Sequence, residues 1–361
     1  MSDPESRYGI SRILSQASLL RLGLIGIIVA GVVICFVWAA GWLSPGRVDQ
    51  TRIINTFEAA SGGPHPGFRR NHAKGVCLTG WFDSNGAGER FSRAIVFRAG
   101  RTPVFGRISL AGGMPRQADT PGAVRSLALN FVLSDGEAWR TGMVDLPVFP
   151  VRDPKAFYQQ MVVSLPDPKT GKPDPAALKA FLDVHPETVA AGKIIKAQPM
   201  SSGFADATYH ALNAFRFVST NGVSTPVRWS MVPVDAVGPT NKEQDKDYLF
   251  DALQTRLQRG PVQWRLIVTI GRPGDPTNDA TLPWPTNREQ VDAGTLSVNA
   301  LQTESDGNCR DISFDPLVLP AGIIPSDDPL LSTRSAAYSV SFRRRASEPK
   351  TPSAVQPGKG T

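Results

Sequence analysis

The sequence predicts an α+β protein in which one N-terminal transmembrane helix precedes a domain built on an antiparallel sheet. Two observations support this fold class. Residues 22–43 contain no charged side chain, and beyond them runs of alternating apolar residues give way to helical patterns. The length of 361 residues is enough for one large domain or two ordinary ones.

The uncharged run 22–43 is long enough to cross a bilayer, because a helix rises about 1.5 Å per residue and the hydrocarbon core is roughly 30 Å thick. Trp38 and Trp42 lie where an interfacial aromatic belt is expected, and Pro45-Gly46 ends the helix. A cleaved signal peptide is the alternative, but the run is long for one and Ala39-Ala40-Gly41 is a weak cleavage site. We therefore expect an uncleaved anchor.

Composition divides the chain into five segments. They are a cytoplasmic head at 1–21, the transmembrane anchor at 22–43, a connector at 44–60, a folded domain at 61–345 and a disordered tail at 346–361. The flanking arginines give only a weak orientation signal, and long domains translocate largely regardless of it. We expect a cytoplasmic N-terminus and a folded domain on the opposite side of the membrane.

In several stretches of the folded domain, apolar and polar residues alternate with a period of two. We expect strands at 92–98, 103–110, 126–133 and 263–270, a hairpin at 214–232, and helices near 174–184, 187–197, 241–259 and 328–342. The hairpin is the clearest of these, because Asn221-Gly222 is a strong two-residue turn signal. Asp327-Asp328-Pro329 is a good start for the last helix.

The net charge of +7 comes from 39 basic and 32 acidic residues that are scattered along the chain. A nucleic-acid surface would cluster its basic residues on one face or helix, so we expect no nucleic-acid partner. Three cysteines do not make a disulfide framework. Cys77 and Cys309 could form a bridge in an oxidising compartment, but two buried free thiols are the simpler expectation.

Five segments of the chain carry recognisable motifs. They are Pro66–Gly75 (PGFRRNHAKG), Arg107–Gly112 (RISLAG), Leu146–Pro154 (LPVFPVRDP), Asn213–Val218 (NAFRFV), and the region from Phe314-Asp315-Pro316 to Arg334 and Tyr338. In this order they resemble the catalase superfamily, and the short chain is similar to the small catalase-related haem peroxidases of bacteria. The resemblance implies a haem-enclosing antiparallel β-barrel with added helices in residues 61–345, with haem b as cofactor.

The resemblance assigns Tyr338 as the ligand of the haem iron, the role tyrosine has in catalases. A phenol has a pKa of about 10 and binds ferric iron well only as the phenolate. Arg334 lies four residues earlier on the same helical face, where a guanidinium stabilises that anion. No Cys-x-x-Cys-His motif occurs, which excludes covalent c-type attachment.

On the other side of the haem, the resemblance assigns His72 as the general base and then acid in peroxide cleavage, a role suited to its pKa. It assigns Ser109 to orient His72, and Arg69 and Arg107 to hold the haem propionates by paired donors. Phe157 is aligned with an aromatic residue that packs on the haem face.

Asp145 departs from the family pattern, because it stands where catalases have an asparagine that donates to bound peroxide. A carboxylate donates only when it is protonated, so Asp145 could be a neutral donor, a second base, or a residue facing away into a salt bridge with Arg140 or Arg152. We keep it as a candidate catalytic residue and expect weak catalase activity.

The function predicted from the resemblance is reduction of hydrogen peroxide, and of organic peroxides, by an unidentified external electron donor. The alternatives are a hydroperoxide-rearranging enzyme on the same fold and a non-enzymatic haem-binding or peroxide-sensing module. With the anchor, the expected location is the bacterial inner membrane, single-pass, with the catalytic domain in the periplasm. The oligomeric state stays open.

Overall fold

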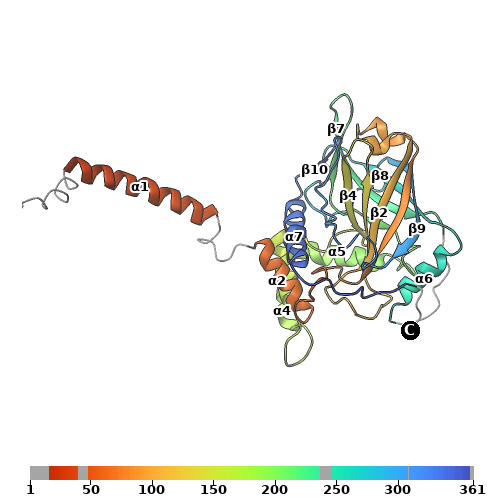
Figure 1. Cartoon of the computed structure of the whole chain (residues 1–361), viewed down its shortest axis with the longest axis horizontal. Coiled ribbons are helices and arrows are strands. Elements are labelled where there is room, and N and C mark those ends of the chain that lie inside the picture. Colours follow the sequence, from red (N-terminus) through yellow and green to blue (C-terminus); the bar gives the residue numbers. More distant parts are fainter. Residues whose placement is uncertain (1–15, 40–47, 236–245, 308, 358–361) are drawn as a thin grey trace, which may run out of the picture. The chain divides into compact units, whose positions relative to one another are not determined.

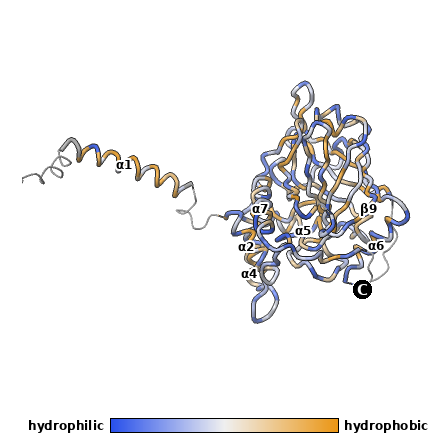
Figure 2. Tube along the Cα trace, in the orientation of Figure 1, coloured by the Kyte–Doolittle hydropathy of each residue, from blue (hydrophilic) through white to orange (hydrophobic). Residues whose placement is uncertain are grey.

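The computed structural model describes residues 16–39, 48–235, 246–307 and 309–357 in two units, Met1–Val48 and Asp49–Thr361. The first unit contains helix α1 (Gln16–Ala39). Its window Leu19–Trp38 has a mean hydropathy of 2.6 and buries none of its residues, and the tube in Figure 2 is hydrophobic along most of it. The helix is long and apolar enough to cross a membrane, a property that signal sequences share. Trp42 and Pro45-Gly46 lie outside the described residues.

The second unit is built on strands that close into a barrel (Figure 1). The strands are β1 (Gly75–Ser84), β2 (Gly100–Leu110), β3 (Arg125–Val132), β4 (Ala138–Val144), β5 (Tyr209–His210), β6 (Phe215–Val218), β7 (Ser224–Pro233), β8 (Val262–Ile270), β9 (Gln290–Gln302) and β10 (Ile323–Pro325). The helices are α2 (Gln50–Ala60), α3 (Pro154–Val163), α4 (Pro175–Val184), α5 (Pro186–Ala197), α6 (Tyr248–Leu257) and α7 (Pro329–Ala346).

All strand pairings are antiparallel, in the order β10-β6-β7-β5-β4-β3-β2-β1-β9-β8, and β7 also pairs with β8. That last pairing closes the sheet. If β5 and β6 are counted as one interrupted strand, the ring has eight positions, and β10 extends it at β6. The barrel interior is the hydrophobic core, with Trp139, Trp264 and Phe131 fully buried. The expected antiparallel barrel with added helices is confirmed, but side chains fill its interior, which corrects the expectation that the barrel encloses a haem.

Helix α2 corrects the expected connector at 44–60. Asp49 caps it by accepting from the backbone N–H of Arg52 at 2.8 Å, and its apolar side chains Ile53 and Ile54 are buried. These contacts attach the helix to the folded unit, so the unit begins at Asp49 rather than residue 61.

The predicted strand at 92–98 is wrong. Its alternation reflects real burial, because Ala94 and Val96 are each 1% exposed. The segment, however, contains the short 3₁₀ helix η2 (Ile95–Phe97) and follows a second one, η1 (Ala87–Arg90), instead of pairing along a strand. Phe97 packs against Phe217 with ring centroids 4.9 Å apart.

The tail is not disordered over residues 346–357. Val355 is fully buried in the main hydrophobic cluster, and Ser353 exchanges hydrogen bonds with Ser305. Glu348 forms an ion pair with Arg70. A Pro- and Ser-rich composition predicted disorder, whereas these specific contacts order the segment.

Cys77 and Cys309 form a disulfide, which corrects the expectation of two free thiols. Their Cα atoms are 5.5 Å apart although 232 residues separate them in sequence. The bond joins strand β1 to the segment that follows β9. Such a long-range closure cannot be read from spacing alone.

Candidate functional site

A cavity of about 540 Å³ lies in the folded unit, lined by residues from β2, β3 and β4 and from helices α2, α3 and α7. Its volume is in the range of small-molecule and cofactor sites. Side chains alternate along a strand, so Ile108, Leu127 and Met143 enter the barrel core while their neighbours line the cavity. The barrel wall therefore serves as the floor of the cavity.

The floor consists of two rows of cross-strand neighbours. One row pairs Ser109 with Ser126 and Ser126 with Val144. The other pairs Arg107 with Ala128 and Ala128 with Gly142. Most of these side chains are small, which leaves space above the sheet for a flat ligand.

Tyr338 lines the cavity from helix α7, where Asp328 caps the helix by accepting from the N–H of Leu330 at 2.9 Å. A Cβ atom added at Gly142 would lie 3.1 Å from the hydroxyl oxygen of Tyr338 and 3.7 Å from an Arg334 nitrogen. A glycine at this place in β4 is what lets the tyrosine hydroxyl approach the sheet.

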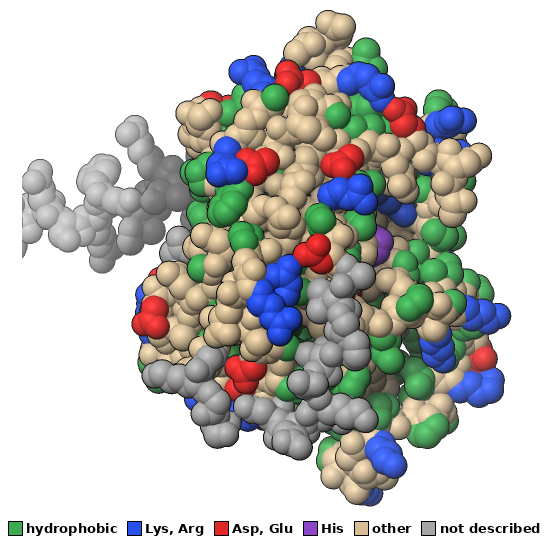
Figure 3. Space-filling model, turned by 90° about the vertical axis from the view of Figure 1, so that its right-hand side faces the viewer, with side chains coloured by type: hydrophobic (Ala, Val, Ile, Leu, Met, Phe, Trp, Pro, Cys, Tyr) green, Lys and Arg blue, Asp and Glu red, His purple; other side chains and the backbone are tan. Residues whose placement is uncertain are grey.

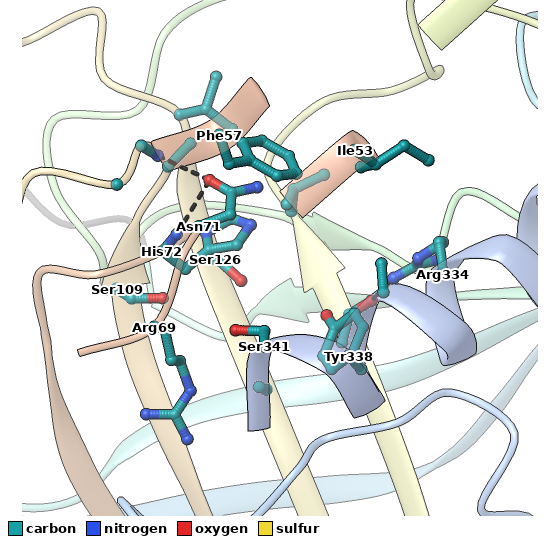
Figure 4. Close-up of a pocket in the computed structure, with 18 of the residues that line it drawn as sticks. Ile53, Phe57, Arg69, Asn71, His72, Ser109, Ser126, Arg334, Tyr338 and Ser341 are labelled. Carbon is teal, nitrogen blue, oxygen red and sulfur yellow. Dashed lines mark hydrogen bonds between the residues drawn. The ribbon is translucent and has the colours of Figure 1, made fainter. Parts of the chain in front are cut away.

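Arg334 is fixed one helical turn from Tyr338 (Figure 4). It donates to the carbonyl of Gly142 at 3.1 Å and to the side-chain oxygen of Asn213. The amide of Asn213 in turn donates to Asp328 at 2.7 Å. Arg334 is thus held beside Tyr338 by a continuous hydrogen-bond chain that includes the helix cap.

His72 lines the cavity from the loop before β1 and has a left-handed backbone, with φ of 56°. Such a conformation is uncommon outside glycine and is often found at functional sites. Burial, followed by the positive charges of Arg107, Arg334 and Arg69, lowers the pKa of His72 to about 3. The imidazole is therefore neutral at ordinary pH and can accept a proton.

The Nδ1 atom of His72 is buried and has no hydrogen-bond partner among the residues that the structure describes. Ser109 lies in the same cavity and is 2% exposed, but the predicted bond to His72 is not formed. A buried nitrogen without a partner is costly, and because Nδ1 has almost no exposed surface a ligand in the cavity does not reach it.

Arg69 and Arg107 share one buried carboxylate, Glu304, at 2.7 and 2.8 Å. Burial alone would raise the pKa of Glu304, but Arg107 and Arg69 lower it below its usual value. Arg345, which the sequence analysis did not single out, also lines the cavity, and burial lowers its pKa to about 10. Two guanidinium groups share the Glu304 carboxylate, and Arg345 adds a third positive charge to the lining, an excess that suits an anionic ligand.

Phe157 lines the cavity from α3, as predicted for an aromatic residue in the site. Its ring lies 6.0 Å from that of Phe57 and 5.6 Å from that of Phe149. Phe57 and Ile53 come from α2, the helix that the sequence analysis took for a connector. Amphipathic spacing in residues 50–60 was the signal that could have found them.

Asp145 does not line the cavity, although its neighbours Val144 and Leu146 do. It accepts from the backbone N–H of Arg125 at 2.9 Å and pairs with its guanidinium at 3.3 Å. Asp145 therefore faces away, but its partner is Arg125 rather than Arg140 or Arg152. Its assignment as a catalytic residue is not supported by this geometry, because its carboxylate is committed outside the cavity.

Comparison with known proteins agrees with this arrangement. Residues 67–351 match the family Catalase. The chain belongs to the catalase family. A catalase-related peroxidase of Synechococcus elongatus is 36% identical over 85% of this chain and 90% of its own length, and one of Mycolicibacterium paratuberculosis is 31% identical over 85% and 96%.

Solved catalases share the fold. A fungal catalase has a TM-score of 0.69 at 19% identity, covering 77% of this chain and 59% of its own. Catalase A from Saccharomyces cerevisiae has a TM-score of 0.68 at 20% identity, covering 77% and 61%. The chain therefore spans about three fifths of the length of the solved catalases it matches.

Proposed function

We propose that this member of the catalase family is a haem-dependent peroxidase that reduces hydrogen peroxide with an external electron donor. The observation that carries the proposal is one cavity that unites Tyr338 and Arg334 on one wall with the buried, neutral His72 on another. The two catalase-related peroxidases that the chain matches over most of their length support the same function.

The residues present fit a haem. The hydroxyl of Tyr338 lies close to strand β4 at Gly142, where there is no side chain. Most side chains of the two rows in the cavity floor are also small. Arg69, Arg107 and Arg345 supply more positive charge than Glu304 neutralises, as two propionates require. No cysteine lines the cavity among the described residues, which favours non-covalent haem b.

Haem bound at Tyr338 would supply the oxidation–reduction chemistry. Arg334, one helical turn away and fixed in the hydrogen-bond chain, would place a positive charge beside Tyr338 when that residue holds the iron. The imidazole of His72 takes the proton from one peroxide oxygen and returns it to the other as the O–O bond breaks. With two electrons from the donor and two protons, hydrogen peroxide becomes two water molecules.

The cavity favours one-electron oxidation of a donor over peroxide disproportionation. Disproportionation requires a second peroxide to be held and oxidised, and Asp145, which stands at the family's donor position, points away. We therefore expect weak or residual catalase activity. Organic peroxides are further candidate substrates, because most of the lining is apolar.

We further propose that α1 anchors the chain in the bacterial inner membrane with the catalytic domain in the periplasm. The apolar window Leu19–Trp38 supports an anchor, and the Cys77–Cys309 disulfide supports an oxidising compartment. Protease added outside intact spheroplasts, with and without detergent, tests the location by immunoblot of the folded unit. Loss of the folded unit in intact spheroplasts supports it, and protection until detergent is added contradicts it.

The donor's docking site is not assigned. On the face of the folded unit shown in Figure 3, charged side chains of both signs are interspersed. A face of this kind provides no single-sign field to steer a charged partner.

The test of the function uses the full-length chain in detergent, expressed with haem supply. An absorption spectrum is recorded, and hydrogen peroxide is then added with and without a dye reductant while oxygen is monitored. A ferric haem spectrum with rapid dye oxidation and little oxygen release supports a peroxidase. Vigorous oxygen release indicates a small catalase, peroxide loss without reductant or oxygen indicates rearrangement, and absence of haem refutes the proposal.

A further inference from the structure

We propose that the side-chain amide of Asn71 is the hydrogen-bond donor that holds a peroxide oxygen beside His72. The inference rests on the proposed function and assigns a positioning residue for the same site. Without it, the region around His72 has an acceptor for the proton of peroxide but no fixed donor for its oxygen.

The orientation of the Asn71 amide is set by two backbone groups. Its Oδ1 atom accepts from the N–H of His72 and from the N–H of Gly112, both at 2.9 Å. Only the oxygen of a carboxamide can accept from two N–H donors, so the assignment of oxygen and nitrogen is unambiguous. Figure 4 shows both bonds on one side of the group and the amide nitrogen on the other side.

The nitrogen Nδ2 makes no hydrogen bond to the residues described here, although Asn71 lines the cavity. Unlike Nδ1 of His72, this nitrogen is not among the buried atoms that lack a partner, so it has surface open to the cavity. A fixed N–H donor in a largely apolar cavity offers a partner to a ligand oxygen such as that of peroxide.

Other polar side chains near His72 fit this role less well. Ser109 and Ser126 line the floor, but a hydroxyl rotates freely to suit its surroundings. Asp145 is committed to Arg125 outside the cavity. The Asn71 amide is fixed before substrate arrives, which is the condition under which a donor contributes most to catalysis.

The same two bonds also hold the left-handed turn at His72, so Asn71 could be structural only. Two variants separate these roles. Asn71→Asp keeps an oxygen for both backbone N–H groups but removes the donor, whereas Asn71→Ala removes both. Asn85→Ala is the control, because the Oδ1 of this exposed asparagine also accepts from a nearby backbone N–H, that of Ala87, while its Nδ2 donates to the carbonyl of Asp292.

The measurements use the full-length, haem-loaded protein. The first is the carbon–oxygen stretching frequency of its ferrous carbon monoxide complex, which falls when a donor lies near the bound oxygen and rises near a negative charge. The second is kcat/KM for hydrogen peroxide. We expect the frequency to rise in the order wild type, Asn71→Ala, Asn71→Asp, and kcat/KM to fall roughly 10- to 100-fold in both variants.

A wild-type frequency and rate in Asn71→Asp, with a loss only in Asn71→Ala, would show that Asn71 merely supports the backbone and would overturn the proposal. Unchanged values in both variants would overturn it as well. If Asn71→Ala loses haem, Asn71→Asp alone decides. A wild type that binds haem but turns over no peroxide refutes the proposed function, while the frequency series still tests the donor.

Discussion

The two walls of the cavity differ in how completely their polar groups are paired. On the α7 wall, Arg334 belongs to a hydrogen-bond chain that runs through Asn213 to Asp328. On the opposite side, His72 has a left-handed backbone, and its Nδ1 has no partner among the described residues. Hydrogen bonds thus fix the arginine beside the proposed iron ligand, whereas the side of His72 keeps an unsatisfied polar group.

The largest expected effect tests the wall of the cavity that helix α7 forms. In Tyr338→Phe the hydroxyl that faces the space at Gly142 is gone, so haem should be lost or its spectrum grossly altered. The haem-to-protein ratio and the absorption spectrum measure this. Tyr158→Phe, a Tyr→Phe change outside the cavity lining, is the control and should retain both. Normal haem in Tyr338→Phe would remove this residue as the iron ligand.

The next effect tests the wall with unpaired groups. His72→Ala should keep haem, because Tyr338 and not His72 is the proposed iron ligand. The rate of peroxide cleavage should fall by about 10²- to 10⁴-fold, the usual contribution of general acid–base catalysis. Stopped-flow mixing with hydrogen peroxide measures the rate, and the haem-to-protein ratio is the control. A retained rate would show that a group other than His72 transfers the proton.

The pH dependence sharpens the comparison. Because the neutral imidazole is the base and the pKa of His72 is lowered to about 3, the acid limb of kcat/KM should lie near pH 3 rather than near the ordinary value of about 6.5. The unfolded chain binds a proton between these values and the folded chain does not. His72 therefore contributes to a loss of stability as the pH falls from about 6.5 toward 3. Rate profiles and denaturant titrations measure the two effects, and an acid limb near pH 6.5 contradicts the assignment.

The smallest effect probes how tightly the paired wall is packed. Gly142→Ala places a methyl group 3.1 Å from the Tyr338 hydroxyl, so the tyrosine must shift by a few tenths of an ångström. We expect haem affinity to fall several-fold, about 1 kcal/mol, when apo-protein is titrated with haem. Gly192→Ala, a helical glycine with open space around it, should have no effect. A wild-type haem affinity in Gly142→Ala would show that Tyr338 can move without loss of haem binding.

Local sequence determined much of the fold. The Asn221-Gly222 hairpin lies where β6 and β7 meet, and helix α7 begins at Pro329 after its Asp328 cap, as expected. Turn chemistry and capping act within a few residues, so they can be read from the chain. The resemblance carried by the five motifs likewise predicted one site for His72, Tyr338 and Arg334, which line one cavity.

Tertiary structure decided the contacts between distant segments. Only the folded chain shows Cys77 bonded to Cys309, α2 forming a wall of the cavity, and Asp145 turned toward Arg125. The direction of a side chain at the end of a strand depends on how the next loop leaves the barrel, and no local pattern encodes that path. For the same reason the orientation of the Asn71 amide depends on the fold, because the N–H that helps to fix its oxygen comes from Gly112, in a different loop.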